Sequence, residues 1–223
     1  MKYSWLVKQK PEHIEKLLSG NPNILAKRDE RKRFVLHWAA VAGREQLCKY
    51  ILQRFPEQLD AGDDMEKTPL ELAACGGSLA TTALMVQEGA DINHRDLLGC
   101  TALNYACSND SFYVVLLLLR EGADLNIADI NGDTPLHRAT EYGRSDIVNT
   151  LLLHGADPNR ANSDGNTPLH LACERNEERC AILLVRGGAT IGSPNQIGLK
   201  PFQLANPSLS YLLLKQSTGR RAG

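Results

Sequence analysis

Few aromatic residues and almost no net charge are the first features of this sequence of 223 residues. Phe, Trp and Tyr together make up 5% of the chain, and 25 basic side chains nearly balance 26 acidic ones. A protein that binds nucleic acid usually carries a markedly basic face, so the charge balance argues against that class of partner. The 43% of hydrophobic residues are nevertheless ample for a buried core.

Long apolar runs are also missing. The longest strong one is Val114–Leu119, far below the ~20 apolar residues that a helix needs to cross a membrane. The N-terminus has too short an apolar core for a signal peptide. We therefore expect no membrane partner and no export, and predict a location in the cytoplasm, with the nucleus as a second compartment.

The sequence shows no pattern that is typical of catalysis or metal binding. Its six cysteines form no CxxC pair, so their spacing predicts no zinc site and no redox motif. The phosphate-binding patterns GxxxxGK[ST] and GxGxxG do not occur. We predict that the protein is not an enzyme, that no residue is catalytic, and that no cofactor or metal is bound.

What the sequence has in abundance is repetition. A motif close to T-P-L-H-x-A recurs at intervals of 33 or 34 residues, with an alanine three residues beyond each anchoring position. A strict period of this length with two apolar helical stretches per unit predicts an all-α solenoid. The motif and the Gly-Ala-Asp that follows it resemble the ankyrin repeat, which implies helix–turn–helix units joined by β-hairpin loops. The anchors are Leu36, Leu70, Leu103, Leu136, Leu169 and Phe202.

Local chemistry explains the motif. Thr134 is a suitable N-cap and Pro135 a suitable first helical residue, because proline lacks an N–H that would be unpaired there. His37, His137 and His170 stand at equivalent places in three repeats, so we interpret them as structural hydrogen-bonding residues. Catalysis would require a base with specific partners, and the stacked copies offer none.

The period divides the chain into seven repeats within a single predicted domain, 1–223. The first and last repeats are shortened caps, as a solenoid requires at its ends. We expect helices at about 3–10 and 11–20 in the first cap, and at 209–215 in the last. The predicted boundaries are 1–32 for the N-terminal cap, 33–66, 67–99, 100–132, 133–165 and 166–198 for the full repeats, 199–216 for the C-terminal cap, and 217–223 for a frayed tail.

Four segments that follow one another in order carry a narrower resemblance. They are RFVLHWAAVAG (33–43), GCTALNYACS (99–108), DTPLHRA (133–139) and DGNTPLHLACE (164–174). Together with the seven repeats they are similar to the gankyrin family of proteasome assembly chaperones. The resemblance implies a monomer that binds the C-terminal domain of one AAA+ ATPase subunit of the proteasome base on its concave face. The alternative is another ankyrin-repeat adaptor or scaffold, in transcription or kinase regulation, since function depends on the variable surface.

The resemblance also implies roles for single residues. Arg33 and Asp64 match positions that meet the ATPase by charge in that family, whereas Arg31 replaces an acidic residue. Vertebrate members carry an L-x-C-x-E motif for pocket proteins. The present chain reads LACER at 171–175, so binding of the retinoblastoma type is not implied.

The predicted partner surface consists of loop tips and the ends of the first helix of each repeat. The repeat consensus leaves these positions free. Leu97 and Leu98 stand out, because adjacent leucines at an exposed turn are unusual without a partner. The full candidate set is Glu30, Arg31, Arg33, Trp38, Val41, Asp63, Asp64, Met65, Lys67, Leu97, Leu98, Ser108, Asn109, Ile130, Asp133, Glu141, Tyr142, Asn166, Glu174 and Arg175.

Charge varies between the first two loops. Segment 27–33 (KRDERKR) has five basic residues, and segment 60–66 (DAGDDME) has four acidic ones. This predicts a strip of two signs that meets acids opposite Arg33 and bases opposite Asp63 and Asp64, and so sets register and association rate. A merely solvated face is the alternative for both segments, and a nuclear-import signal for the first.

Overall fold

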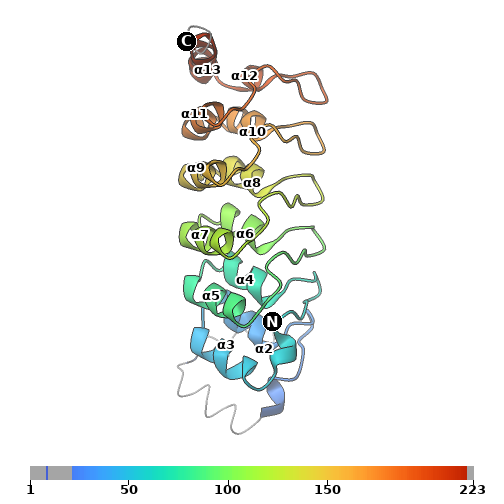
Figure 1. Cartoon of the computed structure of the whole chain (residues 1–223). Coiled ribbons are helices and arrows are strands. Elements are labelled where there is room, and N and C mark those ends of the chain that lie inside the picture. Colours follow the sequence, from blue (N-terminus) through green and yellow to red (C-terminus); the bar gives the residue numbers. More distant parts are fainter. Residues whose placement is uncertain (1–8, 10–21, 220–223) are drawn as a thin grey trace. The chain divides into compact units, whose positions relative to one another are not determined.

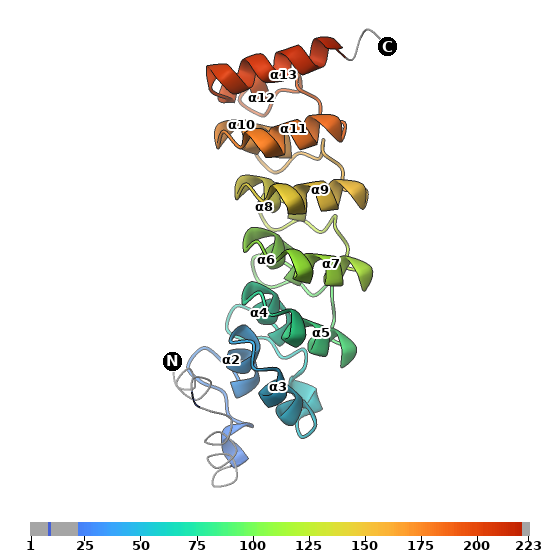
Figure 2. The same cartoon turned by 90° about the vertical axis from the view of Figure 1, so that its left-hand side faces the viewer.

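The structure is a computed structural model that describes residue 9 and residues 22–219. Within these residues all regular elements are helices and no β-strand occurs. Contacts divide the chain into two units, and we describe each by itself: unit 1 runs to Ala123 and unit 2 starts at Asp124. The predicted all-α fold of paired helices is confirmed, and Figures 1 and 2 show the pairs.

Unit 1 contains three helix pairs after a short 3-10 helix, η2. The first helices of the pairs pack on one another in the order α2, α4, α6, and the second helices in the order α3, α5, α7. The anchors Leu36, Leu70 and Leu103 are fully buried between them. The elements are η2 (Pro22–Ile24), α2 (Val35–Val41), α3 (Glu45–Leu52), η3 (Pro56–Gln58), α4 (Pro69–Cys75), α5 (Leu79–Gln87), α6 (Ala102–Ser108) and α7 (Phe112–Arg120).

Unit 2 repeats this arrangement. The first helices α8, α10 and α12 pack in sequence, and so do the second helices α9, α11 and α13. Leu136 and Leu169 are buried anchors as in unit 1. The helices are α8 (Pro135–Glu141), α9 (Ser145–Leu153), α10 (Pro168–Glu174), α11 (Glu178–Arg186), α12 (Pro201–Leu204) and α13 (Pro207–Gly219).

The first helices α4, α8 and α10, which begin with a Thr-Pro pair, follow the predicted chemistry at their start. Thr134 has an extended backbone, and its side chain accepts a hydrogen bond from the amide of His137, while Pro135 is the first helical residue. Helices α5, α7, α9 and α11 each end two residues before a glycine with positive φ, for example Gly122 at 90°, a conformation that glycine adopts without strain.

Two sequence-based expectations differ from the structure. The connecting loops reverse direction as hairpins do, but the described ones hold no strand, because a single five-residue loop closes each reversal. The final helix does not end at residue 215. It continues to Gly219, since no proline interrupts it, and so includes the start of the predicted tail. The two expected helices of the N-terminal cap lie outside the described residues, and the repeat boundaries remain predictions.

Candidate protein-binding surface

Each hairpin loop is built on one Asp or Asn side chain. In the Asp63 loop, Oδ1 of Asp63 accepts hydrogen bonds from the amides of Met65 (2.8 Å) and Lys67 (3.0 Å). The amide of Asp63 in turn donates to the carbonyl of Lys67 at 3.0 Å. Five residues thus close into a rigid turn. The same pattern builds the loops that we name by their first residue: Asp29 (29–33), Asp63 (63–67), Asp96 (96–100), Asp129 (129–133), Asn162 (162–166) and Asn195 (195–199).

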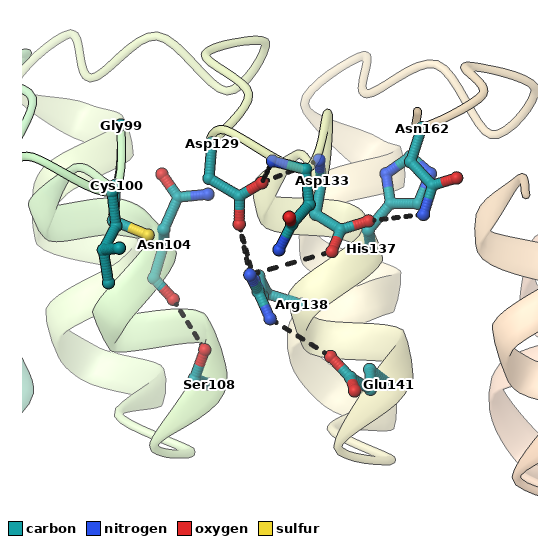
Figure 3. A network of polar contacts seen from close by, with 12 residues as sticks. Gly99, Cys100, Asn104, Ser108, Asp129, Asp133, His137, Arg138, Glu141 and Asn162 are labelled. Atoms are coloured by element: carbon teal, nitrogen blue, oxygen red, sulfur yellow. Dashed lines mark hydrogen bonds and ion pairs between the residues drawn. The ribbon is translucent and has the colours of Figure 1, made fainter. Parts of the chain in front are cut away.

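The second carboxylate oxygen of the loop Asp requires a donor of its own. Two residues beyond the anchor, Trp38 donates from Nε1 to Asp29 (2.9 Å), and Tyr105 donates its hydroxyl to Asp96 (2.5 Å). Arg138 serves Asp129 in the same way, as Figure 3 shows. Trp38, one of the predicted contact residues, therefore has a structural role.

The Asp63 loop lacks that donor, because residue 72 is a leucine. Here Arg33 of the preceding loop donates from Nε to Oδ2 of Asp63 (2.8 Å), and its Nη2 forms an ion pair with the same oxygen (2.7 Å). The Arg33 side chain is 12% exposed and that of Asp63 is 0% exposed. Burial raises the pKa of Asp63, but the hydrogen bonds from Lys67, Arg33 and Met65 outweigh it and lower the pKa overall.

This contact corrects part of the charge-strip prediction. Asp63 is buried and cannot offer its charge to a basic partner residue. Arg33 neutralises it from within the chain, and its guanidinium lies 5.0 Å from the centre of the Trp38 ring. Opposite charges on neighbouring loops thus pair with each other first. Of the three residues in the charge-strip prediction, Arg33, Asp63 and Asp64, only Asp64 remains accessible at a loop tip. Charged neighbours such as Glu30 and Arg31 are exposed there as well.

Accessible charges lie at the first two loop tips. Arg31 is 55% exposed, and its Nε lies 3.6 Å from Oδ2 of Asp64, which is 35% exposed. Glu30 is exposed beside them. Lys67 lies lower in the loop, with Nζ 3.8 Å from Asp96 and 4.3 Å from the centre of the Tyr105 ring. The charged part of the candidate surface is therefore its outer edge.

Backbone hydrogen bonds join the loop tips within unit 1. The amide of Asp64 donates to the carbonyl of Arg31 (2.9 Å), and the amide of Leu97 donates to the carbonyl of Met65 (3.0 Å). The three loops consequently form one continuous row, which we call the loop row. Unit 2 has an equivalent row, joined by Ser163 to Asn131 (2.9 Å) and by Gln196 to Asp164 (3.1 Å).

The apolar end of the loop row in unit 1 is the Asp96 loop. Leu97 is 58% and Leu98 is 40% exposed, and Met65 is half-buried beside them. The remaining candidates of this unit lie on the first helices. Val41 and Ser108 are half-buried. Asn109 is exposed, and its Nδ2 donates to the carbonyl of Cys75 at 3.0 Å.

In unit 2 a polar network occupies the same kind of surface. Arg138 contacts the carboxylates of Asp129, Asp133 and Glu141, which converge on it in Figure 3. Glu141 also accepts a hydrogen bond from Arg175 at 3.0 Å. Asp133, like Asp63, is a predicted contact residue that is buried.

The exposed candidates of unit 2 surround this network. Ile130 is 63% and Tyr142 is 48% exposed, and Glu174 is exposed as well. Asn166 is half-buried and accepts a hydrogen bond from Asn195 at 2.8 Å. Sequence reasoning missed Ile197, which is 77% exposed. It stands five residues before the anchor Phe202, so the rule that selected Leu98 would have found it.

The repeated histidines have the structural role that we predicted. His37 Nδ1 accepts the amide hydrogen of Phe34 (3.2 Å), while Nε2 donates to the carbonyl of Ala61 (2.8 Å). Burial lowers the pKa of His37 to about 4, so the ring is neutral at physiological pH. In unit 2, Nδ1 of His137 and of His170 accepts the amide hydrogens of Thr134 and Thr167, and Nε2 of each donates at 3.1 Å to the last residue of the following loop, Asn166 and Leu199.

Three of the buried cysteines are poor nucleophiles. Burial raises the pKa values of Cys48, Cys173 and Cys180 to about 12 each. In the part of the chain that the structure describes, no group of three or more His, Cys, Asp or Glu side chains could hold a metal ion. Over the same residues, no helix has the length and apolar character needed to cross a membrane.

A profile of ankyrin repeats (3 copies) matches residues 4–96, 82–162 and 131–195 of the sequence. The chain belongs to the ankyrin-repeat family. Ankyrin-repeat proteins are generally non-catalytic modules that bind other proteins. The match covers the loops and first helices described above as far as residue 195, and it does not distinguish between families of ankyrin proteins.

Several curated proteins share part of these repeats. The palmitoyltransferase Hip14 of Drosophila melanogaster is 33% identical over 70 residues, which are 31% of this chain and 11% of that enzyme. Human palmitoyltransferase ZDHHC17 is 32% identical over 75 residues, 34% of this chain and 12% of the relative. Human transient receptor potential cation channel subfamily A member 1 is 36% identical over 98 residues, 43% of this chain and 9% of the channel. The chain thus matches about a tenth of each relative, and their activities do not carry over.

Proposed function

We propose that the chain is a non-catalytic protein-binding module whose partner contacts the loop row of unit 1. One observation carries this proposal: Leu97 and Leu98 are exposed at the end of a row of hydrogen-bonded rigid loops whose other end is charged. Exposed adjacent leucines cost solvation free energy, and a protein partner that covers them recovers it. Because the loops are closed by their own Asp side chains, little conformational entropy is lost on binding.

We further propose that this partner is the C-terminal domain of a proteasomal AAA+ ATPase subunit, and that the protein is a monomeric cytoplasmic or nuclear chaperone in assembly of the regulatory-particle base. The support is the ordered resemblance of four segments to the gankyrin family. Three residues that contribute to it, Trp38, Tyr105 and Arg138, bind loop carboxylates in this structure. They therefore indicate a shared loop architecture more directly than a shared partner.

The test is affinity isolation with the purified full chain from a eukaryotic lysate, followed by identification of the bound proteins by mass spectrometry. We expect one ATPase subunit in free base precursors, without the proteolytic core. A competing experiment with excess ATPase C-terminal domain should abolish the recovery of these precursors. Isolation of a transcription or kinase complex without any ATPase subunit would contradict the chaperone role and favour an adaptor.

A further inference from the structure

The residue that follows the anchor leucine makes one hydrogen bond that recurs in every repeat and a second contact that differs between repeats. In each repeat it accepts the amide hydrogen of the residue that precedes the helix: His37 does so with Nδ1, Glu71 with Oε2 (2.7 Å) and Asn104 with Oδ1 (3.0 Å). The three histidines also donate from Nε2 to the backbone of the following loop segment. A carboxylate has no hydrogen to donate, so α4 needs a different connection.

The following segment supplies that connection through His94. His94 stands nine residues before its anchor Leu103, as Ala61 stands nine residues before Leu70. Its Nδ1 lies 3.1 Å from Oε1 of Glu71. The direction of donation is thus reversed relative to the His37–Ala61 contact: the helix offers the acceptor, and the loop segment offers the donor. Two residues further along the chain, the Asp96 loop begins.

The carboxylate of Glu71 is enclosed. Its side chain is 1% exposed, whereas that of His94 is 25% exposed. On the loop side Glu71 faces the carboxylate of Asp96, and on α6 it faces the phenol of Tyr105. The ammonium group of Lys67 lies against Asp96 and the ring of Tyr105.

The other packed helices add few charges. On α2 the titratable residue is His37, which faces Asp63 and Arg33. Helix α5 carries no titratable residue, and α4 itself carries only Cys75 besides Glu71. His94 is therefore the basic side chain that contacts the carboxylate of Glu71 directly.

We propose that Glu71 and His94 form a pH-sensitive clasp that fastens the Asp96 loop, with Leu97 and Leu98 at its tip, to helix α4. The clasp is tight in mildly acidic solution and opens more often above neutrality. A buried ionised carboxylate gains solvation when the loop segment lifts and water enters, whereas a protonated one does not. The existence of the clasp does not depend on the proposed partner. Only its effect on partner binding rests on the proposed function, so an experiment on the chain alone can refute the clasp without testing the proposed function.

The sign follows from proton binding. Burial raises the pKa of Glu71 to about 7, against hydrogen bonds from Thr68 and His94 that lower it. The closed clasp therefore binds a proton more tightly than the open one, whose carboxyl has the ordinary pKa near 4.5. The closed form is favoured most below about 4.5, and this advantage is lost as the pH rises through about 7. Between about pH 6 and pH 8 the opening equilibrium should increase about tenfold.

Hydrogen exchange resolved by NMR tests this prediction on the full chain without any partner. The amides of Leu97 and Leu98, bonded to Met65 and to Asp96, report on the loop. After correction for intrinsic exchange, their protection should fall about tenfold from about pH 6 to about pH 8. The amide of Ser163 in the Asn162 loop, which donates to the carbonyl of Asn131 and lies behind the neutral His137, is the internal control and should not change.

Glu71→Gln is the decisive variant, since glutamine keeps the acceptor for Thr68 and cannot titrate. It should abolish the pH dependence at Leu97 and Leu98. Equal protection at both pH values in the natural chain, or an undiminished pH dependence in Glu71→Gln, would overturn the proposal. If the variant does not fold, the carboxyl ¹³C shift of Glu71 in the natural chain still decides: a titration midpoint near pH 7 supports the clasp, and a midpoint near the ordinary value of 4.5 refutes it.

Discussion

Arg33 donates a hydrogen bond from Nε to Oδ2 of Asp63 at 2.8 Å, and its Nη2 forms an ion pair with the same oxygen at 2.7 Å. The aspartate is fully enclosed, and its other oxygen holds the amides of its own loop. Each loop Asp that lacks a donor in its own repeat must obtain one elsewhere, and here the preceding loop provides it. Charged residues that the sequence places at the predicted surface can thus pair with each other inside the repeat stack and be unavailable to a partner.

Replacement of Arg33 should destabilise the fold. Arg33→Ala leaves the Asp63 carboxylate buried without its cation, and breaking such a pair costs about 3–5 kcal/mol. Arg31→Ala is the matched control, because Arg31 is 55% exposed and its pairing with Asp64 is long. An exposed pair contributes about 0–1 kcal/mol. Urea denaturation of both variants measures the difference. Equal free energies of unfolding for the two variants would show that the Arg33–Asp63 contact stabilises the fold no more than the exposed Arg31–Asp64 pair does.

The buried histidines make the free energy of unfolding decrease at acidic pH. The pKa of His37 is lowered by burial to about 4, below the ordinary 6.5, so the folded chain binds fewer protons than the unfolded chain between these values. The stabilising contribution of His37 is therefore complete above about pH 6.5 and is lost as the pH falls through about 4.

His37→Asn isolates this contribution, since Asn104 shows that an asparagine can cap the same helix position. The variant should be less stable at neutral pH, because the contact to Ala61 is lost, yet its free energy of unfolding should fall less between about pH 6.5 and pH 4 than that of the natural chain. Denaturation at several pH values provides the comparison. Parallel pH profiles would refute this role for His37.

A buried hydroxyl in unit 2 costs stability. Oγ1 of Thr140 has no hydrogen-bond partner, and the side chain is fully buried. Thr140→Val removes the hydroxyl at nearly constant volume and should raise the free energy of unfolding by about 1 kcal/mol or more. Thr150→Val is the control, because that hydroxyl donates to the carbonyl of Asp146 at 2.8 Å. We expect no gain from the control. A Thr140→Val protein that is less stable than the natural one would contradict the assignment.

The repeat period was sufficient to predict the helix pairs and the structural role of the histidines. Both depend on rules that act within a single repeat, such as a threonine N-cap and a proline in the first turn where they occur, and an acceptor after the anchor leucine. The partner of Asp63 could not be predicted in this way. It depends on residue 72 being a leucine, and on side chains of two loops that meet only in the folded stack.

The candidate surface was predictable as a set of positions, and less so as a set of contacts. Leu97, Leu98 and Ile130 are exposed where the repeat register places them. Asp63 and Asp133 occupy equally variable positions but are buried by neighbouring arginine and asparagine side chains. A single sequence shows charge and position, whereas burial depends on which neighbour supplies a donor.

The most direct test of the loop row is a binding measurement on two matched double variants, with the partner recovered from lysate. Leu97→Ala/Leu98→Ala removes the apolar end of the row in unit 1. Leu79→Ala/Leu116→Ala removes two leucines of similar exposure, 44% and 36%, from the second helices of the same unit. Calorimetry should show that the first pair weakens binding by about 2 kcal/mol or more, as loss of a hot-spot contact does, while its melting transition stays unchanged. The second pair should bind like the natural chain. Equal affinity of the Leu97→Ala/Leu98→Ala protein and the natural chain would contradict the account of how this protein binds its partner.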